Sequence, residues 1–270
     1  MQVKNKIFLV TGAGGGIGTE LCLALLERGA KVAAVDLRDE GLDKLKESAG
    51  DKAERLTTHV LDITDRKAVE NLPEDIIAKQ GSIDAIVNNA GIIQPFVRIN
   101  DLEYDAIDKV MKVNFFGTLY ITKTFLPLLL KRPEAHIVNV SSMGGFLPVP
   151  GQSVYGASKA AVKLMTEGLY AELLDTNVHV SVVFPGATNT HIAENSGAGM
   201  PKAEIDTSKQ KSFPMLSAKE AARIIVDGIE KNKAQIFTGR DSKMMDFLYR
   251  LNPVSATKLI AKQMKSLLPK

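Results

Sequence analysis

Short runs rich in valine, isoleucine and leucine alternate along this chain with longer segments that have the apolar period of helices. Consecutive apolar residues suit parallel strands that are covered on both faces, and the intervening segments suit crossover helices. The alternation therefore predicts an α/β fold, with a doubly wound parallel sheet between two layers of helices. We expect strands at residues 7–10, 31–36, 55–62, 83–87, 136–141, 179–184 and 235–238.

The composition is that of a folded soluble protein. The chain has 270 residues, of which 45% are hydrophobic and 24% charged, enough for a sizeable core. Cys22 is the only cysteine, which excludes an intrachain disulfide, and its apolar neighbours predict a buried thiol. We see neither a signal-peptide pattern nor an apolar stretch of membrane-spanning length, and we therefore expect a cytoplasmic protein.

The charge of the chain is unevenly distributed. The formal net charge is +3, which gives no reason to expect a nucleic-acid partner. From residue 240 onward there are seven Lys/Arg and two Asp/Glu, a net of +5, which leaves the first 239 residues at −2. We expect a catalytic domain over 1–240 and an amphipathic basic helical tail over 241–270.

Two segments fall outside the regular alternation. The polar stretch 187–216 is long enough to predict a lid. In the tail, a helical wheel separates a basic from an apolar face, and residues 244, 247, 248 and 251 form an earlier apolar stripe. Such a tail either lies on an anionic membrane surface or packs on the body of the protein or across a dimer. The basic face holds Lys258, Lys262 and Lys265, and the apolar face holds Ile260, Met264, Leu267 and Leu268.

A glycine-rich turn, TGAGGGIG at 11–18, joins the first strand to a helical segment. Glycines at such a turn let backbone amides approach a pyrophosphate, and the helix N-terminus favours its negative charge. The alternative is a tight turn without a ligand. The spacing is G-x-x-x-G-x-G, and the candidate cofactor-binding residues are Gly12, Gly14, Gly15, Gly16, Ile17 and Gly18.

Asp36 ends the second expected strand, 18 residues after Gly18. A carboxylate there can accept hydrogen bonds from both adenosine ribose hydroxyls and would repel a 2′-phosphate. We therefore expect NAD rather than NADP, although Arg38 is close enough to hold a phosphate. A helix N-cap is the alternative role for Asp36. Asp62 ends the third expected strand, at the same edge of the sheet.

Tyr155 and Lys159 are four residues apart in a helical segment, so their side chains share a face. Ser142 follows a strand, 13 residues before Tyr155. A phenol has a pKa near 10, and a neighbouring ammonium and a cationic nicotinamide would lower it. Tyr155 is thus a candidate acid–base for an alcohol, with Ser142 bonding the substrate oxygen.

Six motifs in order make the chain similar to the short-chain dehydrogenase/reductase family, in its ordinary single-domain branch with a C-terminal extension. They are TGAGGGIG at 11–18, NNAG at 88–91, Asn114, Ser142, YGASK at 155–159 and PGATNT at 185–190. The resemblance implies a Rossmann-type sheet of seven strands and a catalytic tetrad of Asn114, Ser142, Tyr155 and Lys159. It also implies that Tyr155 and Lys159 contact the cofactor, together with Asp62, Ile63, Asn89, Ala90, Gly91, Pro185, Gly186, Thr188 and Thr190. Threonine at 188 replaces the usual branched apolar residue.

The implied activity is NAD(H)-dependent interconversion of an alcohol and a ketone or aldehyde. The apolar loop after Ser142 favours a lipid- or steroid-like substrate, with Ser142, Gly144, Phe146, Leu147 and Tyr155 as substrate contacts. A 3-ketoacyl-thioester reductase using NADPH and a non-enzymatic NAD-binding module are the alternatives. The four histidines show no metal-ligand spacing. The resemblance also implies a homodimer or homotetramer, through the helices around 101–131 and 153–175.

Overall fold

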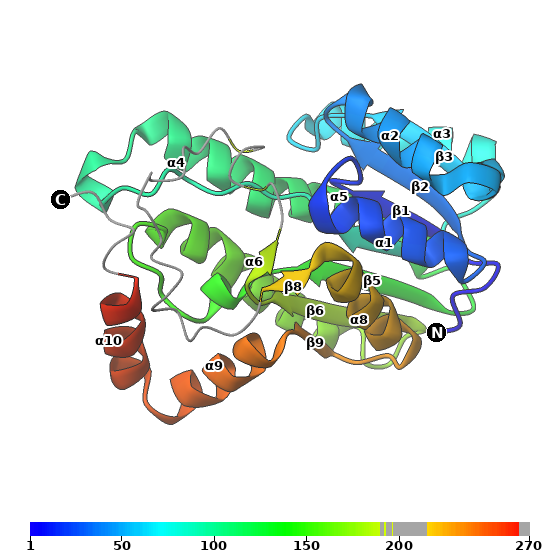
Figure 1. Cartoon of the computed structure of the whole chain (residues 1–270). Helices are drawn as coiled ribbons and strands as arrows, with labels where there is room; N and C mark the ends of the chain where they lie inside the picture. The colour runs from blue at the N-terminus through cyan, green and yellow to red at the C-terminus, as the bar shows by residue number, and fades with distance from the viewer. Residues whose placement is uncertain (190–191, 193–195, 197–214, 265–270) are drawn as a thin grey trace.

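The computed structural model describes residues 1–189, 192, 196 and 215–264 (Figure 1). Its main sheet has seven strands in the order β3-β2-β1-β4-β5-β6-β9, and all neighbouring pairs are parallel. This confirms the predicted sheet, and each expected strand overlaps an observed one. The strands are β1 Ile7–Thr11, β2 Lys31–Asp36, β3 Leu56–Val60, β4 Ala85–Asn88, β5 Ala135–Val140, β6 Val178–Pro185 and β9 Gln235–Thr238.

Helices cover both faces of this sheet. Alternate residues of β1 point to opposite sides, so that Phe8 and Val10 join one core cluster while Ile7 and Leu9 join the other. The first cluster contains residues of α1 (Gly16–Glu27), α2 (Asp39–Ala49) and α8 (Ala218–Glu230). The second contains residues of α3 (Arg66–Gln80), α5 (Thr118–Leu129) and α6 (Ser153–Glu172). Burial on both faces explains why the strands are apolar at consecutive positions.

The strand order reverses at β1, which pairs with β2 on one side and with β4 on the other. In an open α/β sheet, connections that leave in opposite directions open a crevice at the carboxyl ends of the strands, where ligands bind. The remaining connections are η1 (Gly50–Arg55), η2 (Ile99–Asp101), α4 (Tyr104–Met111), the π-helical turn η3 (Lys112–Gly117) and η4 (Met143–Gly145).

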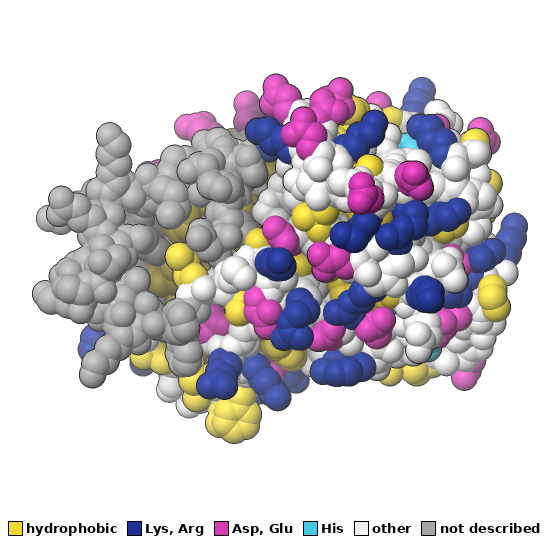
Figure 2. All heavy atoms as spheres, turned by 45° about the vertical axis from the view of Figure 1, so that its right-hand side comes forward, with side chains coloured by type: hydrophobic (Ala, Val, Ile, Leu, Met, Phe, Trp, Pro, Cys, Tyr) yellow, Lys and Arg dark blue, Asp and Glu magenta, His cyan; other side chains and the backbone are white. Residues whose placement is uncertain are grey.

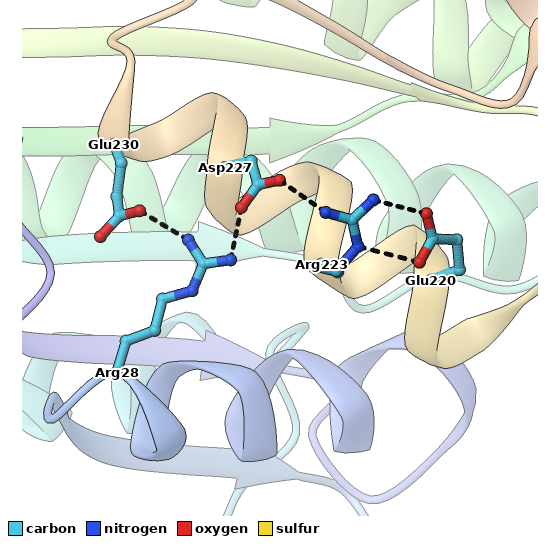
Figure 3. A network of polar contacts seen from close by, with 5 residues as sticks. All are labelled: Arg28, Glu220, Arg223, Asp227 and Glu230. Carbon is cyan, nitrogen blue, oxygen red and sulfur yellow. Dashed lines mark hydrogen bonds and ion pairs between the residues drawn. The ribbon is translucent and has the colours of Figure 1, made fainter.

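An ion-pair network joins α8 to the end of α1 (Figure 3). Arg28, just after α1, pairs with Asp227 and, at 2.6 Å, with Glu230. Asp227 also pairs with Arg223 at 3.1 Å, and Arg223 pairs with Glu220 at 2.7 Å. The network links two helices that are about 200 residues apart in sequence.

The tail forms two helices, α9 (Arg240–Leu251) and α10 (Pro253–Gln263), that pack against each other, and α9 also packs against η4. Met245, Ala256 and Ile260 are buried in one cluster with Leu147. One face of the tail thus packs on the body. The predicted positions of Lys265, Leu267 and Leu268 lie outside the described residues.

The outer face of the tail remains exposed. Phe247 and Leu251 are 61% and 67% exposed, and Met244 and Val254 are exposed as well. The predicted apolar stripe of α9 is therefore split, because Leu248 packs inward while residues 244, 247 and 251 face outward. In the described part of the chain, no helix is long and apolar enough to cross a membrane.

The segment expected to form a lid lies largely outside the described residues. Its two ends do pair, as the short parallel strands β7 (Thr188–Asn189) and β8 (Leu216–Ser217). On the face of the molecule drawn in Figure 2, basic and acidic side chains are interspersed over the surface.

Candidate active site

The glycine-rich turn after β1 leaves the start of α1 open. Gly12 has φ +66°, a conformation that favours glycine, and a Cβ on Gly18 would lie 1.9 Å from the Gly12 carbonyl oxygen. α1 begins at Gly16, and its N-cap, Gly15, makes no side-chain capping bond. The first amides of this helix therefore suit the pyrophosphate of a dinucleotide.

Asp36 is the last residue of β2, as predicted. Its Oδ2 accepts a hydrogen bond from the backbone N–H of Gly14 at 2.9 Å, and its Oδ1 accepts one from that of Arg38 at 3.1 Å. The N-cap of α2 is Arg38, so Asp36 does not cap that helix. These bonds hold the carboxylate at the carboxyl edge of the sheet, beside the glycine turn.

A cavity of about 390 Å³ opens at this edge. Gly14 and Gly18, two of the predicted contacts, do not line it: Gly14 binds Asp36 through its N–H, and Gly18 packs against Gly12. Thr190 lies outside the described residues. The predicted residues that line the cavity are Gly12, Gly15, Gly16, Ile17, Asp36, Arg38, Asp62, Ile63, Asn89, Ala90, Gly91, Ser142, Tyr155, Lys159, Pro185, Gly186 and Thr188.

Sequence reasoning missed several residues of this inner cavity. Lys109 and Val113 line it from α4 and the π-helical turn, and their spacing of four residues puts both on one helical face. Val35, Leu61 and Val140 line it from strand ends, where apolar residues carry no chemical signal.

Thr11 is a further residue whose role was not predicted from the sequence. Its Oγ1 accepts the backbone N–H groups of Asn89 and Ala90, both at 3.1 Å. In return, Asn89 Nδ2 donates to the carbonyls of Thr11 and Gly12. The two cavity-lining loops that follow β1 and β4 are thus held together. Thr11 is the first residue of the glycine-rich motif, and this position is the sequence signal that could have identified it.

Tyr155 and Lys159 lie in the first two turns of α6, and both line the inner cavity. Lys159 is 4% exposed, its Nζ donates to the Val140 carbonyl at 3.0 Å, and burial lowers its pKa to about 8. Burial raises the pKa of Tyr155, and a hydrogen bond with Ser142 opposes that rise. The protein alone therefore favours the neutral phenol, because burial raises the pKa of Tyr155 more than the hydrogen bond with Ser142 lowers it.

Asn114 lies in the π-helical turn and is fully buried. Its Oδ1 accepts the N–H of Ile92 at 2.8 Å, and its Nδ2 donates to the Ile92 carbonyl and to Ser158 Oγ, each at 2.9 Å. A Cβ on Gly91 would lie 3.0 Å from Lys159 Nζ and 3.3 Å from Asn114 Oδ1. Asn114 is thus near Lys159 and holds the loop after β4.

Two adjacent serines, Ser141 and Ser142, follow β5 and make different contacts. Ser141 is buried, and its hydroxyl donates to the Lys159 carbonyl at 2.7 Å. Ser142 Oγ accepts the N–H of Gly144 at 3.0 Å and faces both the inner cavity and a second one. The geometry thus favours Ser142 over Ser141 as the residue that meets a substrate.

The second cavity, of about 370 Å³, shares Ser142, Tyr155 and the segment after β6 with the inner one. Phe146 and Leu147 were predicted to contact the substrate. This prediction is wrong, because neither residue lines the outer cavity. Leu147 is buried against α9 and α10, while Phe146 packs on the same cluster and stacks edge-on against Phe184. Gly144 does line this outer cavity. The apolar residues that line the cavity are Ile93, Phe96, Met143, Val149, Pro185, Ala187, Ile192 and Met215.

The sequence model of short chain dehydrogenases matches residues 6–201. The chain is a short-chain dehydrogenase/reductase. It is 34% identical over 262 residues to the oxidoreductase SadH of Mycobacterium tuberculosis, which covers 96% of this chain and 95% of SadH. It is 38% identical over 196 residues to the 3-oxoacyl-[acyl-carrier-protein] reductase FabG of Thermotoga maritima, over 72% of this chain and 78% of FabG.

Solved structures of short-chain dehydrogenases share this fold. The enzyme from Burkholderia phymatum in complex with NAD superposes with a TM-score of 0.84 at 23% identity, over 94% of this chain and 95% of its own. That from Burkholderia cenocepacia J2315 in complex with NADP gives a TM-score of 0.78 at 28% identity, over 96% and 99%. The chain is therefore a Rossmann-type oxidoreductase with a site for a nicotinamide dinucleotide.

Proposed function

We propose that this short-chain dehydrogenase interconverts an apolar alcohol and its ketone or aldehyde, with NAD(H) as cofactor and Tyr155 as acid–base. The observation that carries the proposal is the meeting of the two cavities at Ser142 and Tyr155. The inner cavity has the glycine turn and acidic strand ends that suit a dinucleotide. The outer one is lined largely by aliphatic and aromatic side chains, which suit an apolar substrate.

A nicotinamide bound in the inner cavity would supply the hydride acceptor for alcohol oxidation. Tyr155 takes the hydroxyl proton of the alcohol, and in the reverse direction it donates that proton to the carbonyl oxygen. Ser142 orients the same oxygen through a hydrogen bond. Lys159 places positive charge beside the phenol while it is protonated, and Asn114 keeps the loop beside Lys159 in place.

We propose NAD as the preferred cofactor because the Asp36 carboxylate is fixed by the amides of Gly14 and Arg38. A fixed carboxylate accepts ribose hydroxyls and repels a 2′-phosphate. The test is the ratio of kcat/KM with NAD and with NADP for the wild type and for Asp36→Asn. Preference for NADP in the wild type would contradict the proposal.

A panel of alcohols ranging from short polyols to steroids and long-chain substrates, assayed with NAD, tests the substrate class. Higher turnover on polyols would contradict the apolar assignment. Tyr155→Phe tests the catalytic role, because it keeps the ring and removes the hydroxyl. Turnover that persists in this variant would exclude Tyr155 as the acid–base.

Two alternative functions make different experimental predictions. The likeness to FabG favours a 3-ketoacyl-thioester reductase using NADPH as the second candidate, and such a protein would reduce an acyl-thioester faster than any free ketone. A non-enzymatic NAD-binding module would bind the dinucleotide and turn over no substrate. Isothermal titration with NAD and NADP, run beside the substrate panel, separates these cases.

We also propose a homodimer or homotetramer through the helices around 101–131 and 153–175, where α6 exposes Leu164 and Tyr170 and the π-helical turn exposes Phe116. Large apolar side chains exposed together are typical of subunit interfaces. Light scattering of the wild type and of Leu164→Glu tests this assembly, and identical masses would exclude Leu164 from the interface.

The catalytic domain over 1–240 and the tail over 241–270 are proposed as functional units of a cytoplasmic protein. The exposed Phe247 and Leu251 lie on α9 near the exposed Lys243, a combination that suits an anionic lipid surface, whereas Arg250 of the same helix is paired with Asp246 at 2.8 Å. Co-sedimentation with anionic and with neutral vesicles tests this, with Phe247→Glu combined with Leu251→Glu as the matched variant. Equal sedimentation of wild type and variant would remove the membrane proposal.

A further inference from the structure

Gln94 is fully buried, and both polar atoms of its side chain are hydrogen-bonded. Its Oε1 accepts the backbone N–H groups of Val154 at 2.8 Å and of Tyr155 at 3.0 Å. Its Nε2 donates to the Gly151 carbonyl at 3.0 Å. These partners lie 57 to 61 residues further along the chain.

The bonds to Val154 and Tyr155 cap helix α6 from a distance. The first amides of a helix have no partner within the helix and need another acceptor. α6 begins at Ser153, and its N-cap, Gln152, makes no side-chain capping bond. Instead, Gln152 Nε2 donates back to the Gln94 carbonyl at 2.9 Å. Gln94 therefore takes the place that a local capping side chain usually fills.

Gln94 also follows directly from the loop that lines the dinucleotide cavity. Asn114 holds that loop at Ile92, through both the N–H and the carbonyl. Two residues further on, Gln94 ties it to the start of α6. The loop is thus anchored on one side to the π-helical turn and on the other to the helix that carries Tyr155.

We propose that Gln94 is a positioning residue for the reaction put forward above, on which this inference rests. By capping α6 it sets the place of Tyr155 relative to the dinucleotide loop. Tyr155 is the third residue of α6 and would move if the first turn frayed. Lys159 lies one turn deeper and is held by its own bond to the Val140 carbonyl. Loss of the cap should therefore slow the chemical step more than it weakens cofactor binding.

The test compares Gln94→Met with Gln80→Met. Gln80 also donates hydrogen bonds through its Nε2, to the Val32 carbonyl and to Thr57 Oγ1, and it is remote in the fold from α6. We expect Gln94→Met to lower kcat by about 10-fold or more with the cofactor KM changed less than about 3-fold, since small misplacements of a reacting group cost that much. Gln80→Met should lower the unfolding midpoint and leave kcat unchanged.

Gln94→Glu is the conservative variant, because its carboxyl group still accepts both amides, and we expect it to recover most of kcat. If Gln94→Met does not fold, Gln94→Asn, whose side chain is too short to reach, takes its place. A kcat equal to that of Gln80→Met, or a loss in Gln94→Glu as large as in Gln94→Met, would overturn the proposal.

Hydrogen exchange provides a readout that needs no substrate. Amides of residues 152–158 should exchange faster in Gln94→Met than in the wild type and in Gln80→Met. Unchanged exchange there would refute the capping role. Absence of turnover in the wild type with every alcohol and ketone would instead refute the proposed function, while the exchange data would still decide whether Gln94 caps α6.

Discussion

Gly186 lines both cavities and meets Asp241 at the start of the tail, and we predict that substitutions at these two positions compensate each other. Asp241 Oδ2 accepts the N–H of Ala187 at 2.8 Å, which ties the segment after β6 to the first turn of α9. A Cβ on Gly186 would lie 2.3 and 2.5 Å from the two carboxylate oxygens of Asp241. Gly186→Ala must therefore displace this carboxylate.

The expected magnitudes follow from these contacts. Asp241→Ala loses one partly solvated hydrogen bond to a charged group, about 1 kcal/mol of unfolding free energy. Gly186→Ala adds an overpacked methyl group, at a cost of about 1–3 kcal/mol. With Asp241 already replaced, the methyl group enters vacated space, and the double variant should lose only about 1 kcal/mol. Additive effects would give about 2–4 kcal/mol.

Urea unfolding of the four proteins, followed by circular dichroism and extrapolated linearly, measures the coupling. Gly168→Ala is the matched control, because a Cβ on Gly168 in α6 would meet nothing within 4 Å. This control should combine additively with Asp241→Ala. Additivity of the Gly186 and Asp241 substitutions within about 0.5 kcal/mol would refute the reasoning.

Three further outcomes are expected. Arg28→Met should lower the free energy of unfolding by about 1 kcal/mol at neutral pH. Arg28 holds the pKa of Asp227 below its usual value, so this contribution exists above the unfolded pKa of about 4 and is lost as the pH falls below it. The urea midpoints of variant and wild type should therefore converge in acid, and a constant gap would contradict the ion-pair origin. The Lys159 ammonium is present below its pKa of about 8 and lost above it, so NAD affinity should weaken as the pH rises through that value. Isothermal titrations with NAD should show this inflection in the wild type and lose it in Lys159→Met. Burial raises the pKa of Cys22, so a thiol reagent should label it only after urea unfolding, and rapid labelling of the folded protein would contradict its burial.

Features that depend on neighbours along the chain could be predicted from the sequence. The parallel strands follow from consecutive apolar residues, and Asp36 lies at a strand end because the run 31–36 stops there. Tyr155 and Lys159 share a face because four residues nearly complete a helical turn. The choice of Ser142 over Ser141 rested on spacing, and the structure adds that Ser141 is engaged with the Lys159 carbonyl.

Features that depend on distant contacts could not be predicted. Phe146 and Leu147 were predicted to form a pocket wall because they follow Ser142 in the sequence. In the structure they are covered by the tail helices, which lie about a hundred residues further along the chain. The pKa expected for Tyr155 took account of charge alone, whereas the fold buries the phenol, and this burial raises its pKa.

The sequence by itself determined the α/β class, the glycine turn and the motif that places this chain among the short-chain dehydrogenases, because each depends on local period and spacing. Only the tertiary structure decided that Gln94 caps the helix of Tyr155, that Asp241 holds the segment after Gly186, and that the tail packs beside the site. Each of these contacts joins groups more than 50 residues apart. A polar side chain gives no sign in sequence of the distant amide it will meet, since that partner is set by how the elements pack.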